Sequence, residues 1–157
     1  MGLFQILLFL HVIGAIIAFG PGFASMVVGP MVAKEPQHGN FYARTQLTTA
    51  KSLVTPLALS MAITGIAMIT VRGWTNVVGA SLWLPVAIVL YVIAIVYAFA
   101  VQAPAGRRLV ELTSTPPAPG SAPNPEVPQT AKRLKNGGII LTLLVTSIVF
   151  LMVTKPF

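Results

Sequence analysis

Four long apolar stretches, separated by polar segments, dominate the pattern of hydrophobic and polar positions along the chain. A helix rises about 1.5 Å per residue, so about 20 apolar residues cross the hydrocarbon core of a bilayer. Each stretch is long enough for one crossing. The pattern therefore predicts an all-α integral membrane four-helix bundle with spans at about residues 3–33, 52–71, 82–101 and 137–154.

The first of these stretches is too long for one straight crossing. As a helix, its 31 residues would reach roughly 46 Å. Gly20-Pro21-Gly22 is the natural place for a bend, because proline removes a backbone donor from the helix. The alternative is a helix that continues past the membrane core as far as Lys34.

Composition supports the membrane class. Of the 157 residues, 55% are hydrophobic and only 8% are charged, whereas about 25% of the residues in a soluble domain carry charge. So little charge cannot cover the surface of a water-soluble fold. We therefore expect a single membrane domain over residues 1–157, with the lipid bilayer as its first partner.

The basic residues predict an orientation. Eight of the ten lie in the first and third connections, around residues 34–51 and 107–135, and the remaining two are Arg72 and Lys155. The positive-inside rule then places both termini outside the cell and the basic, proline-rich loop at 104–136 in the cytoplasm, with 115–129 as an extended linker. The positive-inside rule accounts for the distribution of the basic residues that give the net charge of +7. No nucleic-acid partner is therefore expected.

His11 is the one ionisable side chain inside the first apolar stretch. It shares a helical stripe with the small residues Gly14, Ala18 and Gly22, which let helix backbones approach closely in lipid. Ala94 and Ala98 form a second such stripe on the third stretch. His11 is therefore expected to face the bundle or a partner chain, because exposing an imidazole to lipid is costly.

Two interpretations of His11 stay open. In the first, the imidazole forms a hydrogen bond with a neighbouring helix. In the second, it is an axial ligand of haem or a ligand of a metal. The hydroxyl groups that could serve the first interpretation belong to Ser60, Thr64, Tyr91, Tyr97, Thr142, Thr146 and Ser147.

Other metal ligands are sparse. The second histidine, His38, lies in a polar turn roughly 30 Å or more from His11 by helix geometry. Met61 and Met68 share a face of the second stretch and would suit a soft copper ion. Methionines in so apolar a chain mostly serve packing.

The chain lacks the residue sets of conventional enzymes. It contains no cysteine, no aspartate and no carboxylate inside an apolar stretch. A paired-carboxylate site, a Ser/His/Asp triad, an HExxH motif and a phosphate-binding glycine loop are all missing. A non-enzymatic role is therefore favoured.

The segment "LLFLHVIGAIIAFGPG" resembles the first span of the bacterial integral membrane family known as domain of unknown function 2269. "VTPLALSMAITGIAMITVRGW", "SLWLPVAIVLYVIAIVYAF" and "GRRLVEL" continue the resemblance over roughly residues 5–112. The resemblance implies four spans and no assigned activity. We expect the protein in the inner (plasma) membrane of a bacterial cell. The first span is also similar to that of the copper-resistance D proteins and the membrane-bound protoporphyrinogen oxidases.

Three functions remain open. The small-residue stripes favour a packing or accessory subunit of a membrane assembly. The alternative is a haem-binding or redox membrane protein with His11 as ligand, in which a homodimer supplies the second imidazole. A second alternative is a transporter of copper or a small solute.

Overall fold

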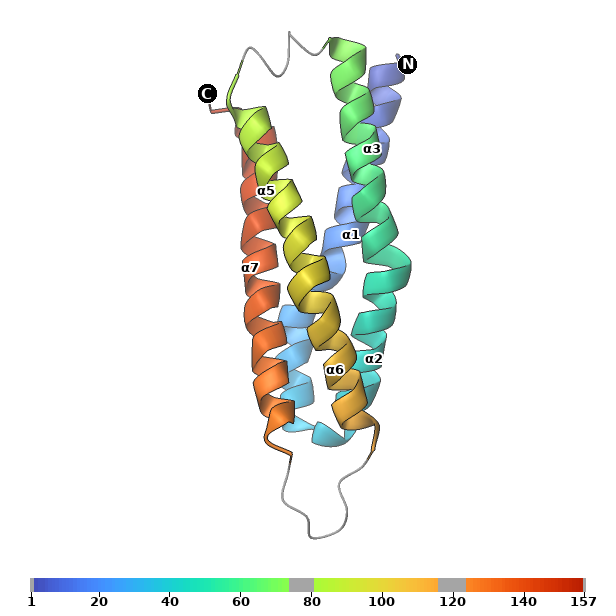
Figure 1. Ribbon diagram of the computed structural model, residues 1–157. Coiled ribbons are helices and arrows are strands. Elements are labelled where there is room, and N and C mark those ends of the chain that lie inside the picture. The colour runs from blue at the N-terminus through green and yellow to red at the C-terminus, as the bar shows by residue number, and fades with distance from the viewer. Residues whose placement is uncertain (1, 74–80, 116–123, 157) are drawn as a thin grey trace.

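The computed structural model describes residues 2–73, 81–115 and 124–156, and every regular element in these ranges is helical (Figure 1). Four of its helical rods are long and apolar enough to cross a membrane. The predicted all-α membrane bundle is thereby confirmed. In chain order the elements are α1 (Leu3–Lys34), the 3₁₀ turn η1 (Pro36–His38), α2 (Gly39–Thr49), the π turn η2 (Ala50–Val54), α3 (Thr55–Arg72), α5 (Trp83–Tyr97), the π turn η3 (Ala98–Gln102), α6 (Ala103–Ser114) and α7 (Glu126–Thr154).

The helical rods are longer than the apolar stretches. α2, η2 and α3 form one continuous rod, as do α5, η3 and α6, and α7 begins well before its apolar part. Much of the segment 104–136, expected as a loop, is therefore helical, and residues 116–123 lie outside the described residues. Pro128 stands in the first turn of α7, where the missing N–H of proline costs no hydrogen bond.

Helix α1 runs without interruption from Leu3 to Lys34, with Pro21 and Pro30 inside it. The stretch is thus a single helix that continues through Gly20-Pro21-Gly22 to Lys34, and the bend predicted at this site stays a prediction. In a membrane, water does not compete for the freed carbonyls, and neighbouring helices support the backbone around a proline. Lys34 thus lies at the far end of the rod from the N-terminus.

Each π turn ends two residues before a proline. The N–H of Thr55 bonds to the carbonyl of Ala50, and the N–H of Ala103 bonds to that of Ala98. Pro56 and Pro104 cannot donate to the carbonyl four residues earlier, so the backbone widens by one residue and keeps its carbonyls paired. The two rods therefore continue past prolines that would otherwise break their hydrogen bonding.

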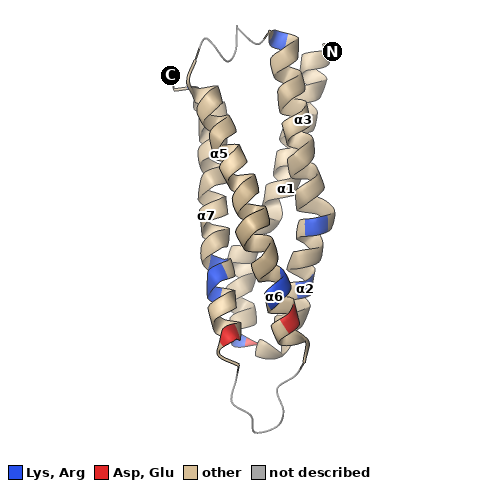
Figure 2. Cartoon of the chain, in the orientation of Figure 1, with Lys and Arg blue, Asp and Glu red and all other residues tan. Residues whose placement is uncertain are grey.

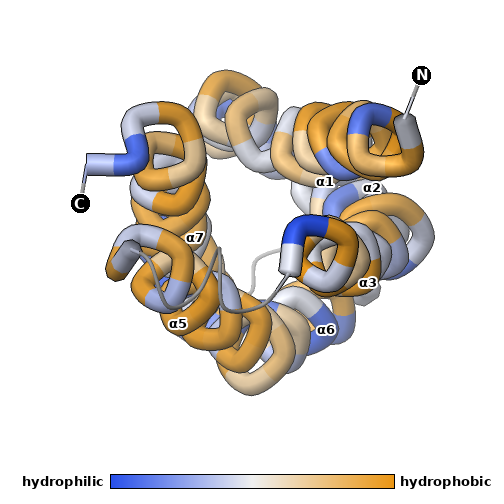
Figure 3. Tube along the Cα trace, turned by 90° about the horizontal axis from the view of Figure 1, so that it is seen from above, coloured by the Kyte–Doolittle hydropathy of each residue, from blue (hydrophilic) through white to orange (hydrophobic). Residues whose placement is uncertain are grey.

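The four rods form two pairs. α1 packs along α3, and α5 packs along α7, on opposite sides of the molecule (Figures 1 and 3). At the end that carries both termini, each pair has its own cation–π contact. The Arg72 guanidinium lies 4.1 Å from the centre of the Phe4 ring, and the Lys155 ammonium lies 5.7 Å from that of Trp83. The pairs diverge towards this end (Figure 1).

The two pairs meet at the opposite end. There α6 packs against both α2 and α7, and the Asn40 side-chain amide donates to the Val110 carbonyl and the Thr113 hydroxyl. Halfway along, the Tyr91 hydroxyl of α5 donates to the Ala58 carbonyl of α3. Most charged residues gather at this end, away from the termini (Figure 2), so we name it the charged end.

Candidate functional site

His11 of α1 forms a hydrogen bond with Thr64 of α3. The distance from Nδ1 to Oγ1 is 2.9 Å. The Thr64 hydroxyl also donates to the Ser60 carbonyl at 3.0 Å, with the Met61 carbonyl at 3.2 Å. A hydroxyl group has a single proton. Because the Thr64 hydroxyl donates this proton to a backbone carbonyl, its Oγ1 atom accepts a hydrogen bond from the His11 Nδ1–H group. This arrangement favours the neutral tautomer whose lone pair is on Nε2.

Small residues let the imidazole approach α3. A Cβ built on Gly65 would lie 3.6 Å from His11 Cε1, in ordinary contact, so the ring edge packs directly against the α3 backbone. One turn along α1, a Cβ built on Gly14 would lie 3.6 Å from the Cγ atom of Met61. The ring, half-buried between two helices, is thus positioned by packing as well as by its hydrogen bond.

The predicted small-residue stripe divides into two parts. Gly14 and Ala18 are buried in the contact of α1 with its neighbours. Gly22 is exposed, and a Cβ added to it would have nothing within 4 Å. On the α5 side, Ala94 is buried and Ala98, at the start of η3, is half-buried.

The second histidine lies at the charged end. His38 Nε2 is 3.5 Å from a carboxylate oxygen of Glu35, and both side chains are exposed. Within residues 2–73, 81–115 and 124–156, no three His, Cys, Asp or Glu side chains gather in a way that would hold a metal ion. Met61 is buried at the α1–α3 contact. Copper ligation by the methionines stays a prediction.

A second polar cluster, which the sequence analysis missed, lies between η3 and α7. Gln102 Nε2 donates to the Leu134 carbonyl at 3.2 Å, while its Oε1 is buried and has no hydrogen-bond partner in the described part of the chain. Gly137 makes room for it, because a Cβ there would lie 2.7 Å from Gln102 Nε2 and 3.0 Å from the Tyr97 hydroxyl. A glutamine near the end of an apolar stretch was the available signal.

A comparison with known families decides the family of the chain. Residues 5–156 match the family described as a predicted integral membrane protein (DUF2269). The chain belongs to this family. The match extends the resemblance seen in the sequence through α6 and α7, so all four membrane rods are part of the DUF2269 domain. No curated protein and no solved structure matches the chain.

The family confirms that this DUF2269 protein is an integral, multi-pass membrane protein. It assigns no reaction, ligand or partner to it. The chemistry of His11 therefore has to be argued from the chain's own contacts.

Proposed function

We propose that this DUF2269 protein is a packing or accessory subunit of an assembly in the bacterial plasma membrane, with a second copy or another membrane protein as its neighbour. Gly22 carries this proposal. It is exposed on α1, and open space surrounds the position of a Cβ. A glycine at an exposed helix face in lipid allows another helix to approach the backbone closely.

The pairing of the rods supports the same role. Near the termini, the α1–α3 pair and the α5–α7 pair are each closed by a separate cation–π contact. A neighbouring helix can therefore contact α1 without breaking either pair. Within the chain, His11 then acts as a polar link that holds α1 on α3.

The test is association of the full chain in its native membrane. Native mass spectrometry of protein released in lipid nanodiscs should give a mass above that of the monomer. Gly22→Leu, which places a bulky side chain at the contact, should reduce the assembled fraction, whereas Gly22→Ala should retain it. A monomer without a co-purifying partner contradicts the proposal.

A second candidate function, haem binding, is favoured by the state of the His11 ring. Nδ1 is occupied by the Thr64 hydroxyl, which leaves Nε2 as the ring nitrogen for a metal. Histidines that ligate a metal commonly use one nitrogen for the metal and the other for an oriented hydrogen bond. One chain supplies a single such imidazole, so a haem ligated by two histidines requires two copies of the chain.

An absorption spectrum of the protein, purified after haem supplementation, tests this candidate. A Soret band is expected in the wild type, and His11→Ala should abolish it. Thr64→Val leaves Nε2 in place and should retain the band with a changed position or stability. The absence of a band in the wild type, or a band that His11→Ala leaves unchanged, contradicts the candidate.

A further inference from the structure

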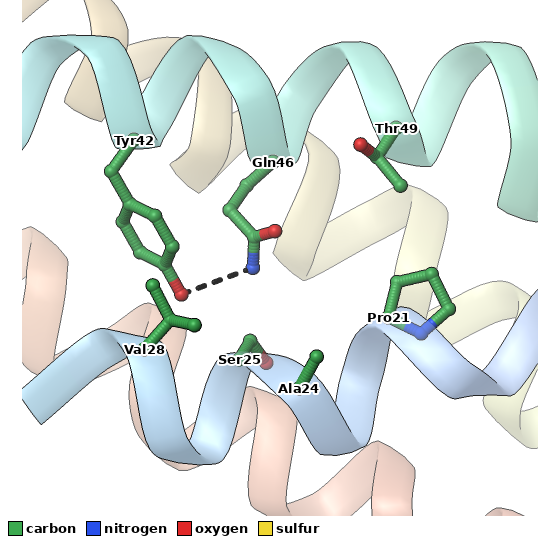
Figure 4. A pocket seen from close by; sticks show the side chains of 7 residues that line it. All are labelled: Pro21, Ala24, Ser25, Val28, Tyr42, Gln46 and Thr49. Atoms are coloured by element: carbon green, nitrogen blue, oxygen red, sulfur yellow. Dashed lines mark hydrogen bonds between the residues drawn. The ribbon is translucent and has the colours of Figure 1, made fainter.

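Two hollows flank α2 near the charged end of the bundle. The first, of about 380 Å³, lies between α1 and α2 (Figure 4). The second, of about 350 Å³, lies on the outer face of α2. Thr49 lines both, so they are adjacent. We name them the groove and the outer hollow.

The groove has one apolar and one polar wall. Pro21, Ala24 and Val28 of α1 form the mainly apolar wall, which also contains Ser25, whose hydroxyl donates to the Gly22 carbonyl. From α2, Tyr42 and Gln46 point towards α1 and form the polar wall, with the Gln46 amide donating to the Tyr42 hydroxyl at 3.2 Å (Figure 4). The groove runs from the level of Val28 to that of Pro21, which is the direction from the charged end towards the bilayer centre.

The outer hollow is lined by a cation and hydroxyl groups. Its residues, including Phe41, Arg44, Thr45 and Thr48, recur every three or four positions and form one face of α2. The chain has only three side-chain carboxylates. Glu35 pairs with His38, and both other glutamates pair with Arg108. Arg44 therefore has no carboxylate partner among the described residues.

The threonines of the two hollows differ from those elsewhere in the rods. Thr45, Thr48 and Thr49 make no hydrogen bond within the described residues. Their hydroxyls are therefore available to an external hydrogen-bond partner. Six threonines instead donate to a carbonyl three or four residues earlier on their own helix, namely Thr64, Thr70, Thr113, Thr142, Thr146 and Thr154.

From these observations we infer a binding site for one anionic phospholipid molecule on α2. The Arg44 guanidinium and the hydroxyls of Thr45 and Thr48 bind the phosphate and its glycerol oxygens in the outer hollow. One acyl chain lies in the groove against Pro21 and Ala24, pointing towards the bilayer centre. Guanidinium suits this role because its planar fork donates two hydrogen bonds to a phosphate, and basic pockets beside membrane helices commonly bind lipid headgroups.

The full chain, delipidated in neutral detergent, tests the proposal by native mass spectrometry with phosphatidylglycerol. One tightly bound lipid per chain is expected, with phosphatidylcholine binding at least about tenfold more weakly. Arg44→Gln should weaken phosphatidylglycerol binding about tenfold. The matched control is Arg107→Gln on α6. It removes another exposed cation that has no carboxylate partner in the described part of the chain, and it should change the affinity less than about twofold.

Two further arms distinguish the site from simpler explanations. Ala24→Leu, which fills the groove, should weaken binding of the diacyl lipid and leave binding of glycerophosphoglycerol, the headgroup without chains, unchanged. Thr45→Val with Thr48→Val keeps every charge and should still weaken lipid binding. If Arg44→Gln does not accumulate in the membrane, this double variant tests the headgroup contacts in its place.

Four results would overturn the proposal. Equal losses for Arg44→Gln and Arg107→Gln would mean diffuse attraction by the charged end. Equal affinity for phosphatidylcholine would mean annular lipid without headgroup recognition. Displacement of the lipid by inorganic phosphate at equal concentration would mean a plain anion site. Unchanged binding in Arg44→Gln and in the double threonine variant would mean that the lipid lies elsewhere.

Discussion

The Nδ1 atom of His11 lies 2.9 Å from the Oγ1 atom of Thr64, and this contact joins residues 53 positions apart in the chain. It links α1 to α3 beside Gly65, where a Cβ would lie 3.6 Å from the His11 Cε1 atom. A side-chain hydrogen bond between helices in lipid is worth only about 1 kcal/mol. The contact therefore orients the ring more than it stabilises the fold.

Thr64→Val tests the energetic part of this statement. Valine matches threonine in shape but cannot bond to the imidazole, so the free energy of unfolding should fall by about 1 kcal/mol. Denaturant unfolding of the protein in bicelles measures the change. Thr70→Val, on the same helix, removes an exposed hydroxyl that bonds only to its own backbone, and it should have little effect. Equal losses in the two variants would contradict a specific His11–Thr64 contribution.

Gly137→Ala tests the packing around Gln102. The added methyl would lie 2.7 Å from Gln102 Nε2, so the glutamine side chain must shift, and we expect its bond to the Leu134 carbonyl to weaken. We expect a loss of about 1 kcal/mol in unfolding free energy. Gly138→Ala is the matched control, since its nearest neighbour is 3.9 Å away, and it should be neutral or slightly stabilising.

The same prediction has a rescue variant. Gln102→Ala removes the closest contacts of the added methyl and leaves the Tyr97 hydroxyl at 3.0 Å, so Gly137→Ala should cost less in this background. A cost equal to that in the wild-type background would show that the two residues are not coupled. Unfolding of the four variants in one lipid composition completes this double-mutant cycle.

Asn40→Ala tests the link between the two halves of the chain at the charged end. The Asn40 amide holds the last turns of α6 through Val110 and Thr113. Without it, hydrogen exchange in α6 (Ala103–Ser114) should become faster, while α1 stays unchanged. Gln37→Ala, an exposed change in η1, serves as the control. Unchanged exchange in α6 would mean that apolar packing alone holds this helix.

Reporter fusions at the two termini test the orientation. Both termini lie at the end away from most of the charges (Figures 1 and 2), and the positive-inside rule places the basic end in the cytoplasm. We expect a reporter that is active only outside the cytoplasm to be active when it is fused to either terminus. Two cytoplasmic termini would reverse the predicted orientation, and termini on opposite sides would contradict the four-rod fold.

Local composition was enough to predict the membrane rods. Three features of the sequence determine how the chain interacts with lipid and water. They are the apolar stretches, the scarcity of charge, and the basic residues near 34–51 and 107–135. Lipid requires each backbone polar group to be paired within its own helix, so a long apolar stretch has almost no alternative to a helix. Beyond the third apolar stretch the chain continues as the polar helix α6, which composition did not predict.

The partners of the rods depended on tertiary structure. Seven hydroxyl side chains were candidates for His11 in the sequence, and the packing of α1 against α3 selected Thr64. The fit of Gln102 over Gly137 had no equivalent in the hydrophobic pattern. All four rods are apolar, so hydrophobicity does not distinguish one neighbour from another in lipid. Shape, loop connection and a few polar contacts decide the pairing, and these depend on residues far apart in the chain.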